Sequence, residues 1–151
     1  KNNKDSEILY HLNKTNFCNQ KIFKKHNDLF IKNLISIFKE RTNTLLELTE
    51  NINLSLKDEF VFEEHEKIIL QKTVNFKDEI LNELTRLDNW NDYIIESTIN
   101  DLIHKLNIKF KDVGQPLRLS LLGCLNGPTI SKFMEIIGKE KTIQKIKINW
   151  K

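Results

Sequence analysis

The chain has 151 residues, of which 39% are hydrophobic and 30% charged, a composition typical of one soluble globular domain or two small helical ones. No apolar run approaches the roughly 18 residues that cross a bilayer, and no secretory signal is present, so we expect a cytoplasmic protein without a membrane partner. The net charge of +3 permits an anionic partner without requiring one.

Apolar residues recur every three or four positions through most of the chain, which is the spacing of amphipathic helices. This period predicts helices over residues 28–39, from near residue 44, over 76–87 and over 91–106. Thr44 followed by Glu47 has the pattern of a capping box, and Asn89 or Asn91 can cap the fourth helix. No stretch shows the sustained alternation of a half-buried strand. The sequence therefore predicts an all-α fold.

All four glycines and both prolines lie in the last forty or so residues. They predict three short helices there: one with Pro116 in its first turn and Gly123 as its stop, one opened by Pro128 and ended by Gly138, and one over 140–147. Short helices joined by tight turns expose many helix ends on one surface. Such a surface suits the binding of a ligand by its shape.

The helical period lapses near residues 53–60, and we place the boundary between two subdomains there, 1–53 and 54–151. The chain begins with Lys1 rather than Met, and we expect it to be a piece of a longer protein. Cys18 and Cys124 are expected to be reduced thiols, because no secretory signal is present.

The sequence predicts no catalytic residue and no metal site. The histidines show no ligand spacing; they are His11, His26, His65 and His104. Glu63, Glu64 and Glu66 surround His65, but an acidic helix start that favours the helix dipole explains them. The segment 123–127 lacks the Lys and Ser/Thr of a phosphate-binding loop.

The most specific motifs stand near the C-terminus: Val-Gly-Gln-Pro-Leu-Arg-Leu-Ser-Leu-Leu-Gly over 113–123, Asn-Gly-Pro over 126–128 and Ile-Ile-Gly-Lys-Glu over 136–140. With Arg41-Thr-Asn-Thr-Leu-Leu-Glu upstream, they resemble the anticodon-binding region of bacterial-type glutamyl-tRNA synthetases. That family has a Gln-Pro-Leu-Arg helix, a Gly-Pro turn and a Leu-Gly-Lys-Glu turn. The resemblance covers most of residues 30–148.

The resemblance implies a two-part helical anticodon-binding superdomain whose partner is the anticodon loop of tRNA(Glu). It also implies a parent enzyme that couples glutamate to tRNA with ATP and magnesium in a class I catalytic domain. The signatures of that domain do not occur here, so we expect neither cofactor in this chain. We expect a monomer that does not bind DNA.

Arg41 matches the family position that reads the third anticodon base, which is C in glutamate anticodons and G in glutamine anticodons. The O2 and N3 acceptors of cytosine suit a guanidinium fork. Guanine would turn donors toward donors, a mismatch of about 1–3 kcal/mol when buried. On residue chemistry alone, a cation at a helix C-terminus is the favoured explanation of Arg41, and only the resemblance favours base reading.

By the same resemblance, the other predicted RNA contacts are Arg118, Asn126, Gly127, Pro128 and Ile130. A salt bridge from Arg118 to Asp112 or Glu135 is the competing explanation, and Gly127 and Pro128 are also ordinary turn residues. The tail is basic and could contact phosphates or form a solvated face through Lys139, Lys141, Lys145, Lys147 and Lys151. Two other functions stay open, another RNA-binding module and a helical protein-interaction module.

Overall fold

The computed structural model describes residues 2–14 and 25–151, so Cys18 lies outside the described residues. The predicted all-α class is confirmed, because every regular element in these two ranges is a helix. The chain divides into two compact units, Lys1–Lys57 and Asp58–Lys151. The sequence pattern placed the boundary after residue 53. In the structure the division falls after Lys57, because helix α4 extends to Ser55.

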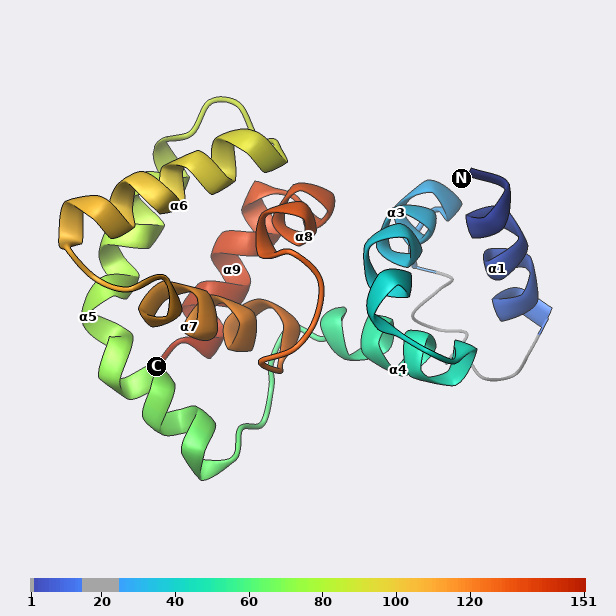
Figure 1. Ribbon diagram of the computed structural model, residues 1–151, viewed down its shortest axis with the longest axis horizontal. Coiled ribbons are helices and arrows are strands. Elements are labelled where there is room, and N and C mark those ends of the chain that lie inside the picture. Colours follow the sequence, from blue (N-terminus) through green and yellow to red (C-terminus); the bar gives the residue numbers. More distant parts are fainter. Residues whose placement is uncertain (1, 15–24) are drawn as a thin grey trace. The chain divides into compact units, whose positions relative to one another are not determined.

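The N-terminal unit contains α1 (Asn2–Lys14), α3 (Asp28–Phe38), the 3₁₀ turn η1 (Lys39–Arg41) and α4 (Leu45–Ser55). Helix α3 packs against both α1 and α4 (Figure 1). Its apolar stripe supplies half of a small core made by Leu9, Leu12, Ile31, Leu34, Ile35, Phe38, Leu48 and Ile52.

Side-chain caps fix where the helices of this unit begin. The side chain of Asn27 accepts a hydrogen bond from the backbone N–H of Phe30 at 2.8 Å. Thr44 Oγ1 accepts from the N–H of Glu47 at 3.1 Å, as the predicted capping box requires. The carboxylate of Glu47 reaches one residue further back than in the standard motif, to the N–H of Asn43 at 2.9 Å.

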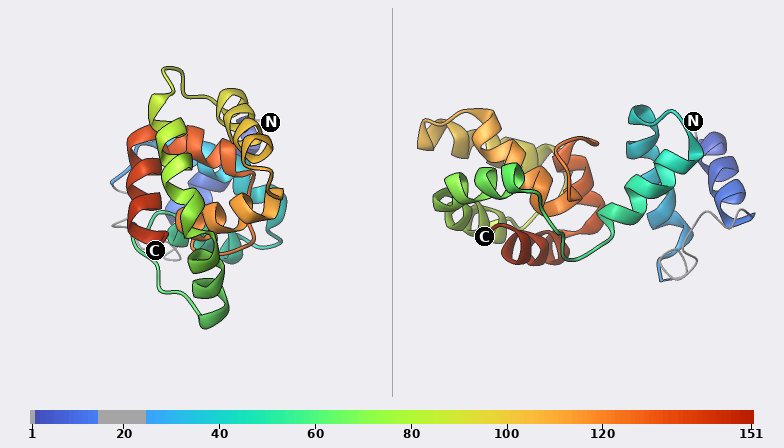
Figure 2. Two further views of the ribbon diagram at one scale, coloured as in Figure 1. Left: turned by 90° about the vertical axis from the view of Figure 1, so that its left-hand side faces the viewer. Right: turned by 90° about the horizontal axis from the view of Figure 1, so that it is seen from below.

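The C-terminal unit contains α5 (Glu64–Arg86), α6 (Asp92–Leu106), α7 (Phe110–Leu122), α8 (Ile130–Ile137) and α9 (Lys139–Asn149). Helices α5, α7 and α9 pack against one another, and α6 packs against α8 (Figures 1 and 2). Helix α8 also contacts α7 and α9 and so joins the two groups.

The predicted start of the helix over 76–87 is wrong, because α5 begins at Glu64. Between Glu64 and Phe76 only Leu70 and Thr73 are buried, so the apolar period is too sparse there to reveal a helix. The start is held locally, since the carboxylate of Glu66 accepts from the N–H of Glu63 at 2.9 Å. The acidic helix start expected at these residues is therefore present.

Helix α7 also begins earlier than predicted, at Phe110, which places Pro116 inside the helix rather than in its first turn. Proline lacks the N–H that would bond the carbonyl of Asp112, and such a loss disfavours a helix interior by about 3 kcal/mol. The helix continues because Val113 and Leu117, on either side of Pro116, are buried in the core.

The predicted helix ends at the glycines are confirmed. Gly123 ends α7 with φ of 76°, and its N–H donates to the carbonyl of Leu119. Gly138 follows α8 with φ of 86°. The start of α8 lies two residues after Pro128, with Thr129 as its N-cap, and α9 runs from Lys139 to Asn149 instead of 140–147.

No helix of the described ranges has both the length and the apolar character needed to cross a membrane.

Candidate nucleic-acid interface

Arg118 joins helix α7 to the turn that precedes α8. Its Nη1 atom donates to the backbone carbonyls of Pro128 at 3.0 Å and Gly127 at 3.3 Å. The half-buried guanidinium therefore holds the Gly-Pro turn. The sequence predicted an RNA contact or a salt bridge for Arg118, and did not predict this contact. Two motifs that the resemblance placed in one site thus meet in the structure.

The turn itself is shaped by backbone geometry and packing. Gly127 has φ of 145°, and a Cβ added there would lie 3.0 Å from Leu122 Cδ1. Pro128 is buried, while Asn126 is exposed and its carbonyl accepts a hydrogen bond from Cys124 Sγ. The turn therefore presents Asn126 to solvent and keeps Pro128 against the unit's interior.

Cys124 is a free thiol within this turn, as expected. Burial raises the pKa of Cys124, although the nearby charge of Arg118 opposes this rise. The thiol is accordingly protonated at neutral pH and poorly nucleophilic.

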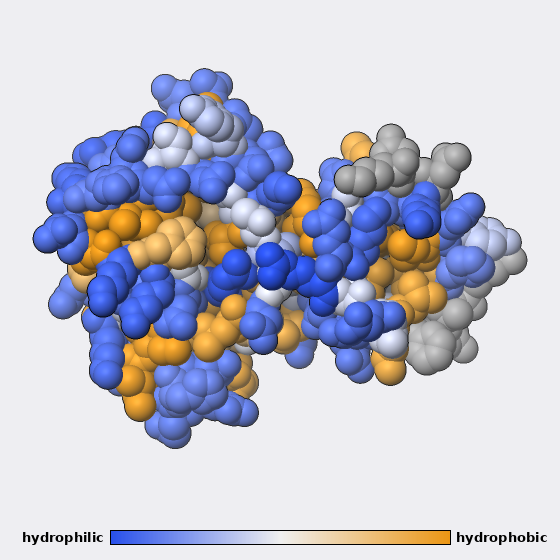
Figure 3. Space-filling view, in the orientation of Figure 1, coloured by the Kyte–Doolittle hydropathy of each residue, from blue (hydrophilic) through white to orange (hydrophobic). Residues whose placement is uncertain are grey.

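Ile130 begins α8 and is half-buried, so Arg118, Asn126, Gly127, Pro128 and Ile130 all belong to one region of the C-terminal unit. A shallow pocket opens beside them among α6, α7 and the start of α8. Figure 3 shows apolar atoms reaching the surface over α6 and α7 of this unit. The pocket is lined by Glu96, Ile99, Asn100, Phe110, Gly114, Leu117, Arg118, Thr129, Ile130 and Ser131.

Arg41 lies in the N-terminal unit, where it is the last residue of η1 and its side chain is exposed. It thus occupies a helix C-terminus and is also accessible to a ligand, so its geometry agrees with both explanations offered by the sequence. Leu45 and Leu46, in the first turn of α4, are exposed as well. This segment presents a cation followed closely by apolar side chains.

The tail lysines do not form one basic face. Lys145 contradicts the prediction that these lysines contact phosphates or are solvated. Its side chain is buried, with its ammonium group 4.9 Å from the ring centre of Phe60, so it can neither contact phosphate nor lie on a solvated face. Lys139 donates to the carbonyl of Leu87, and Lys141 forms an ion pair with Asp58. One face of α9 is buried, with Thr142, Lys145, Ile146 and Asn149, and a count of lysines along the sequence does not reveal which of them lies on that face.

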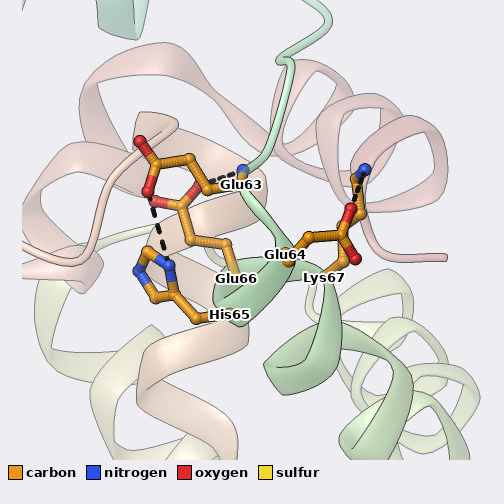
Figure 4. Close-up of polar contacts among 5 residues, drawn as sticks. All are labelled: Glu63, Glu64, His65, Glu66 and Lys67. Atoms are coloured by element: carbon orange, nitrogen blue, oxygen red, sulfur yellow. Dashed lines mark hydrogen bonds and ion pairs between the residues drawn. The ribbon is translucent and has the colours of Figure 1, made fainter.

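The acidic residues around His65 form a helix cap. Figure 4 shows the Glu63 carboxylate beside the imidazole of His65, at 3.5 Å, while Glu64 points away and pairs with Lys67 at 2.9 Å. Within residues 2–14 and 25–151, no three His, Cys, Asp or Glu side chains are grouped so as to hold a metal ion.

A family model described as an anticodon binding domain matches residues 9–149. The chain belongs to this family. The match spans both units, and so includes Arg41 as well as the turn held by Arg118.

Individual relatives of this anticodon-binding domain are glutamate–tRNA ligases. The enzyme of Blochmanniella floridana is 30% identical over 115 residues, which are 75% of this chain and 24% of the relative. That of Thermosipho melanesiensis is 31% identical over 121 residues, 78% of this chain and 26% of the relative. The chain therefore spans about a quarter of the length of these relatives.

The fold agrees with solved structures of the same group. A crystal structure of a glutamate tRNA ligase from Elizabethkingia meningosepticum superposes with a TM-score of 0.76 and 26% identity, covering 95% of this chain and 28% of that one.

Sequence reasoning missed Phe110 and Asn149, which shape the C-terminal unit, and gave Lys145 the wrong role. For Phe110 a signal was available, since Gly114 stands one helical turn later and a glycine inside a helix needs a reason. For Lys145 and Asn149 the sequence carries no local signal. Their roles depend on partners in other segments of the chain, such as Phe60 for both of them.

Proposed function

We propose that this domain recognises the anticodon loop of tRNA(Glu) as the non-catalytic part of a cytoplasmic, monomeric glutamate–tRNA ligase that does not bind DNA. It would thereby support the ATP-dependent formation of glutamyl-tRNA during translation. The observation that carries the proposal is the Arg118 guanidinium holding the Gly127–Pro128 turn in a chain of the anticodon-binding family.

The chemistry of an unpaired RNA loop suits these residues. Proteins recognise such loops by stacking splayed bases and by hydrogen bonds to their polar edges. An arginine fork can do both, and Arg41 is exposed for this purpose. The turn over 126–128, which Arg118 holds through two carbonyls, offers the exposed side chain of Asn126.

ATP and magnesium would serve in the catalytic domain of the parent enzyme. The described residues of this chain contain no cluster of three or more His, Cys, Asp or Glu side chains that could hold a metal ion, and its Gly123–Gly127 segment lacks the Lys and Ser/Thr of a phosphate-binding loop. We therefore propose that neither cofactor binds in this domain, and we assign it no chemical step.

The test compares two anticodon stem-loops that differ only in whether the third base is C or G. We expect Arg41→Gln to weaken binding of the C loop by about 1–3 kcal/mol, because a bidentate contact is lost. Binding of the G loop should change little, since glutamine both donates and accepts. Fluorescence-anisotropy titration at fixed salt measures both, and circular dichroism confirms that the helices are intact.

Arg86→Gln is the matched control, because Arg86 is an exposed arginine in the last turn of α5 and pairs only with its neighbour Glu83 among the contacts described. It should leave the C-to-G preference unchanged. Equal binding of both loops by the unmodified chain would favour another RNA-binding function. No binding of either loop would favour a protein-interaction module.

A further inference from the structure

The pocket among α6, α7 and α8 has an aromatic wall that the predicted RNA contacts do not include. Phe110, the first residue of α7, lines this pocket and is 64% exposed. A phenylalanine so exposed gains little from burial within its own chain. Its position on the rim leaves the ring accessible to a flat ligand.

Gly114 explains how the ring of Phe110 is held. Gly114 is buried within α7 and does not have a positive φ, so backbone conformation does not require glycine there. A Cβ at this position would lie 3.0 Å from Phe110 Cε1. Because Gly114 has no side chain, the Phe110 ring can lie against the next turn of α7. This arrangement is present although glycine in a helix interior lowers stability by about 1 kcal/mol.

The wall that α6 contributes to the pocket carries two polar residues beside Ile99. Glu96 and Asn100 project from α6, and together they offer carboxylate and amide acceptors and amide donors. Lys109 and Lys111 flank Phe110 in the chain, and both are exposed. An exposed aromatic ring with cations next to it in the chain is the combination that binds single-stranded nucleic acid, and Glu96 and Asn100 add hydrogen-bonding groups.

We propose that this pocket holds one unpaired base of the bound RNA, stacked on Phe110 with its polar edge toward Glu96 and Asn100. The proposal rests on the proposed function and adds to it a base-stacking residue and a second wall. The acidic wall favours a base over a phosphate as occupant, because Glu96 would repel an anion. The exposed Lys109 and Lys111, on either side of Phe110 in the chain, would pair with the phosphates that flank the stacked base.

The test is a double-mutant cycle between Phe110 and the RNA, made with the 151-residue chain. Anticodon stem-loops that lack one loop base at a time are titrated against the unmodified chain and Phe110→Ala. We expect Phe110→Ala to raise the Kd for the intact loop about 5- to 150-fold, the range for one base stacked on an aromatic ring. Removal of one particular base should have the same effect on the unmodified chain and no further effect on Phe110→Ala.

Two variants separate stacking from folding. Phe110→Tyr keeps the ring and should bind nearly as well as the unmodified chain. Tyr93→Ala removes an aromatic ring that is 79% exposed on α6 but does not line the pocket, and it should not change the Kd. Gly114→Ala should weaken binding less than Phe110→Ala does and without loss of helicity, because its Cβ would lie 3.0 Å from Phe110 Cε1 and would shift the ring slightly.

The outcomes distinguish this proposal from the function on which it rests. If the unmodified chain binds no stem-loop, the proposed function itself is wrong. If it binds the loop but Phe110→Ala has no effect, or if every missing base affects both proteins equally, the stacking site is wrong while anticodon recognition stands. The exposed ring would then belong to a surface for another protein.

Discussion

At the scale of single residues, Lys145 has the most unusual environment. Only 1% of it is exposed, and its ammonium group lies over the rings of Phe60 and Phe133, at 4.9 and 5.8 Å from their centres. Burial lowers the pKa of Lys145 to about 7; Asp58 opposes this shift, and the charge of Lys141 contributes to it. The aromatic rings stabilise a cation, but loss of water outweighs them.

This environment predicts a pH dependence of stability. The unfolded chain keeps Lys145 protonated up to about pH 10.5, whereas the folded chain loses that proton near pH 7. The unfolded state therefore binds more protons between these values, and the free energy of unfolding should rise with pH there, by at most about 1.4 kcal/mol per pH unit. Lys145→Met should remove this slope and stabilise the protein at pH 7 by about 1–4 kcal/mol.

Denaturant titrations from pH 6 to 10 measure both effects as differences between variants. Lys147→Met is the control, since Lys147 is exposed on the same helix and should leave the slope unchanged. Parallel pH profiles for the unmodified chain and Lys145→Met would contradict the assignment.

At the scale of elements, the end of α9 fastens the segment that leads into α5. The amide nitrogen of Asn149 donates to the carbonyls of Asp58, Lys145 and Ser120 at 2.9, 3.0 and 3.1 Å. Its amide oxygen accepts from the N–H of Phe60 at 3.0 Å. One side chain thus joins α7, α9 and the segment before α5, and the platform that carries Arg118 depends on it.

Asn149→Asp tests this connection with almost no change in shape. An aspartate keeps an acceptor for Phe60 but turns an oxygen toward three carbonyls, so we expect a loss of about 2–5 kcal/mol in the free energy of unfolding. Asn82→Asp makes the same change at an exposed position of α5 and should stay within about 0.5 kcal/mol of the unmodified chain. Chemical denaturation followed by circular dichroism compares them, and equal stabilities would contradict this role for Asn149.

At the scale of the whole molecule, each of the two units has a core of its own. Leu34 and Ile35 are fully buried in the N-terminal unit, as Ile95 and Phe133 are in the C-terminal one. The N-terminal unit is the smaller, and small units bury proportionally less surface on folding and are less stable. The two units are therefore expected to unfold separately.

This expectation can be measured because both tryptophans, Trp90 and Trp150, lie in the C-terminal unit. Trp150 is fully buried and donates from Nε1 to the carbonyl of Leu70. In a guanidinium titration, helicity from circular dichroism should begin to fall at a lower concentration than that at which tryptophan fluorescence changes. Coincident transitions would show that the chain unfolds as one cooperative unit.

The candidate site was only partly predictable from the sequence. The motif around Arg118 and Pro128 stands out because its residue types are rare in the chain, and the structure brings these residues together. The sequence could not predict that Arg118 holds the turn through backbone carbonyls. Every residue has such a carbonyl, so residue identity does not show which one accepts a hydrogen bond. The family match supports the region as a whole, whereas the part of each residue in RNA binding stays a prediction.

The sequence by itself determined the helical class and several helix boundaries. Thr44 and Asn91 cap helix starts and Gly123 ends a helix, each through a partner within four residues, so the local sequence is enough to predict these boundaries. Only the tertiary structure decided that Pro116 lies inside a helix and that Lys145 is buried, because burial against distant segments outweighs local preference in both. Periodicity tells which residues turn toward a core, but only packing decides which partners they meet there.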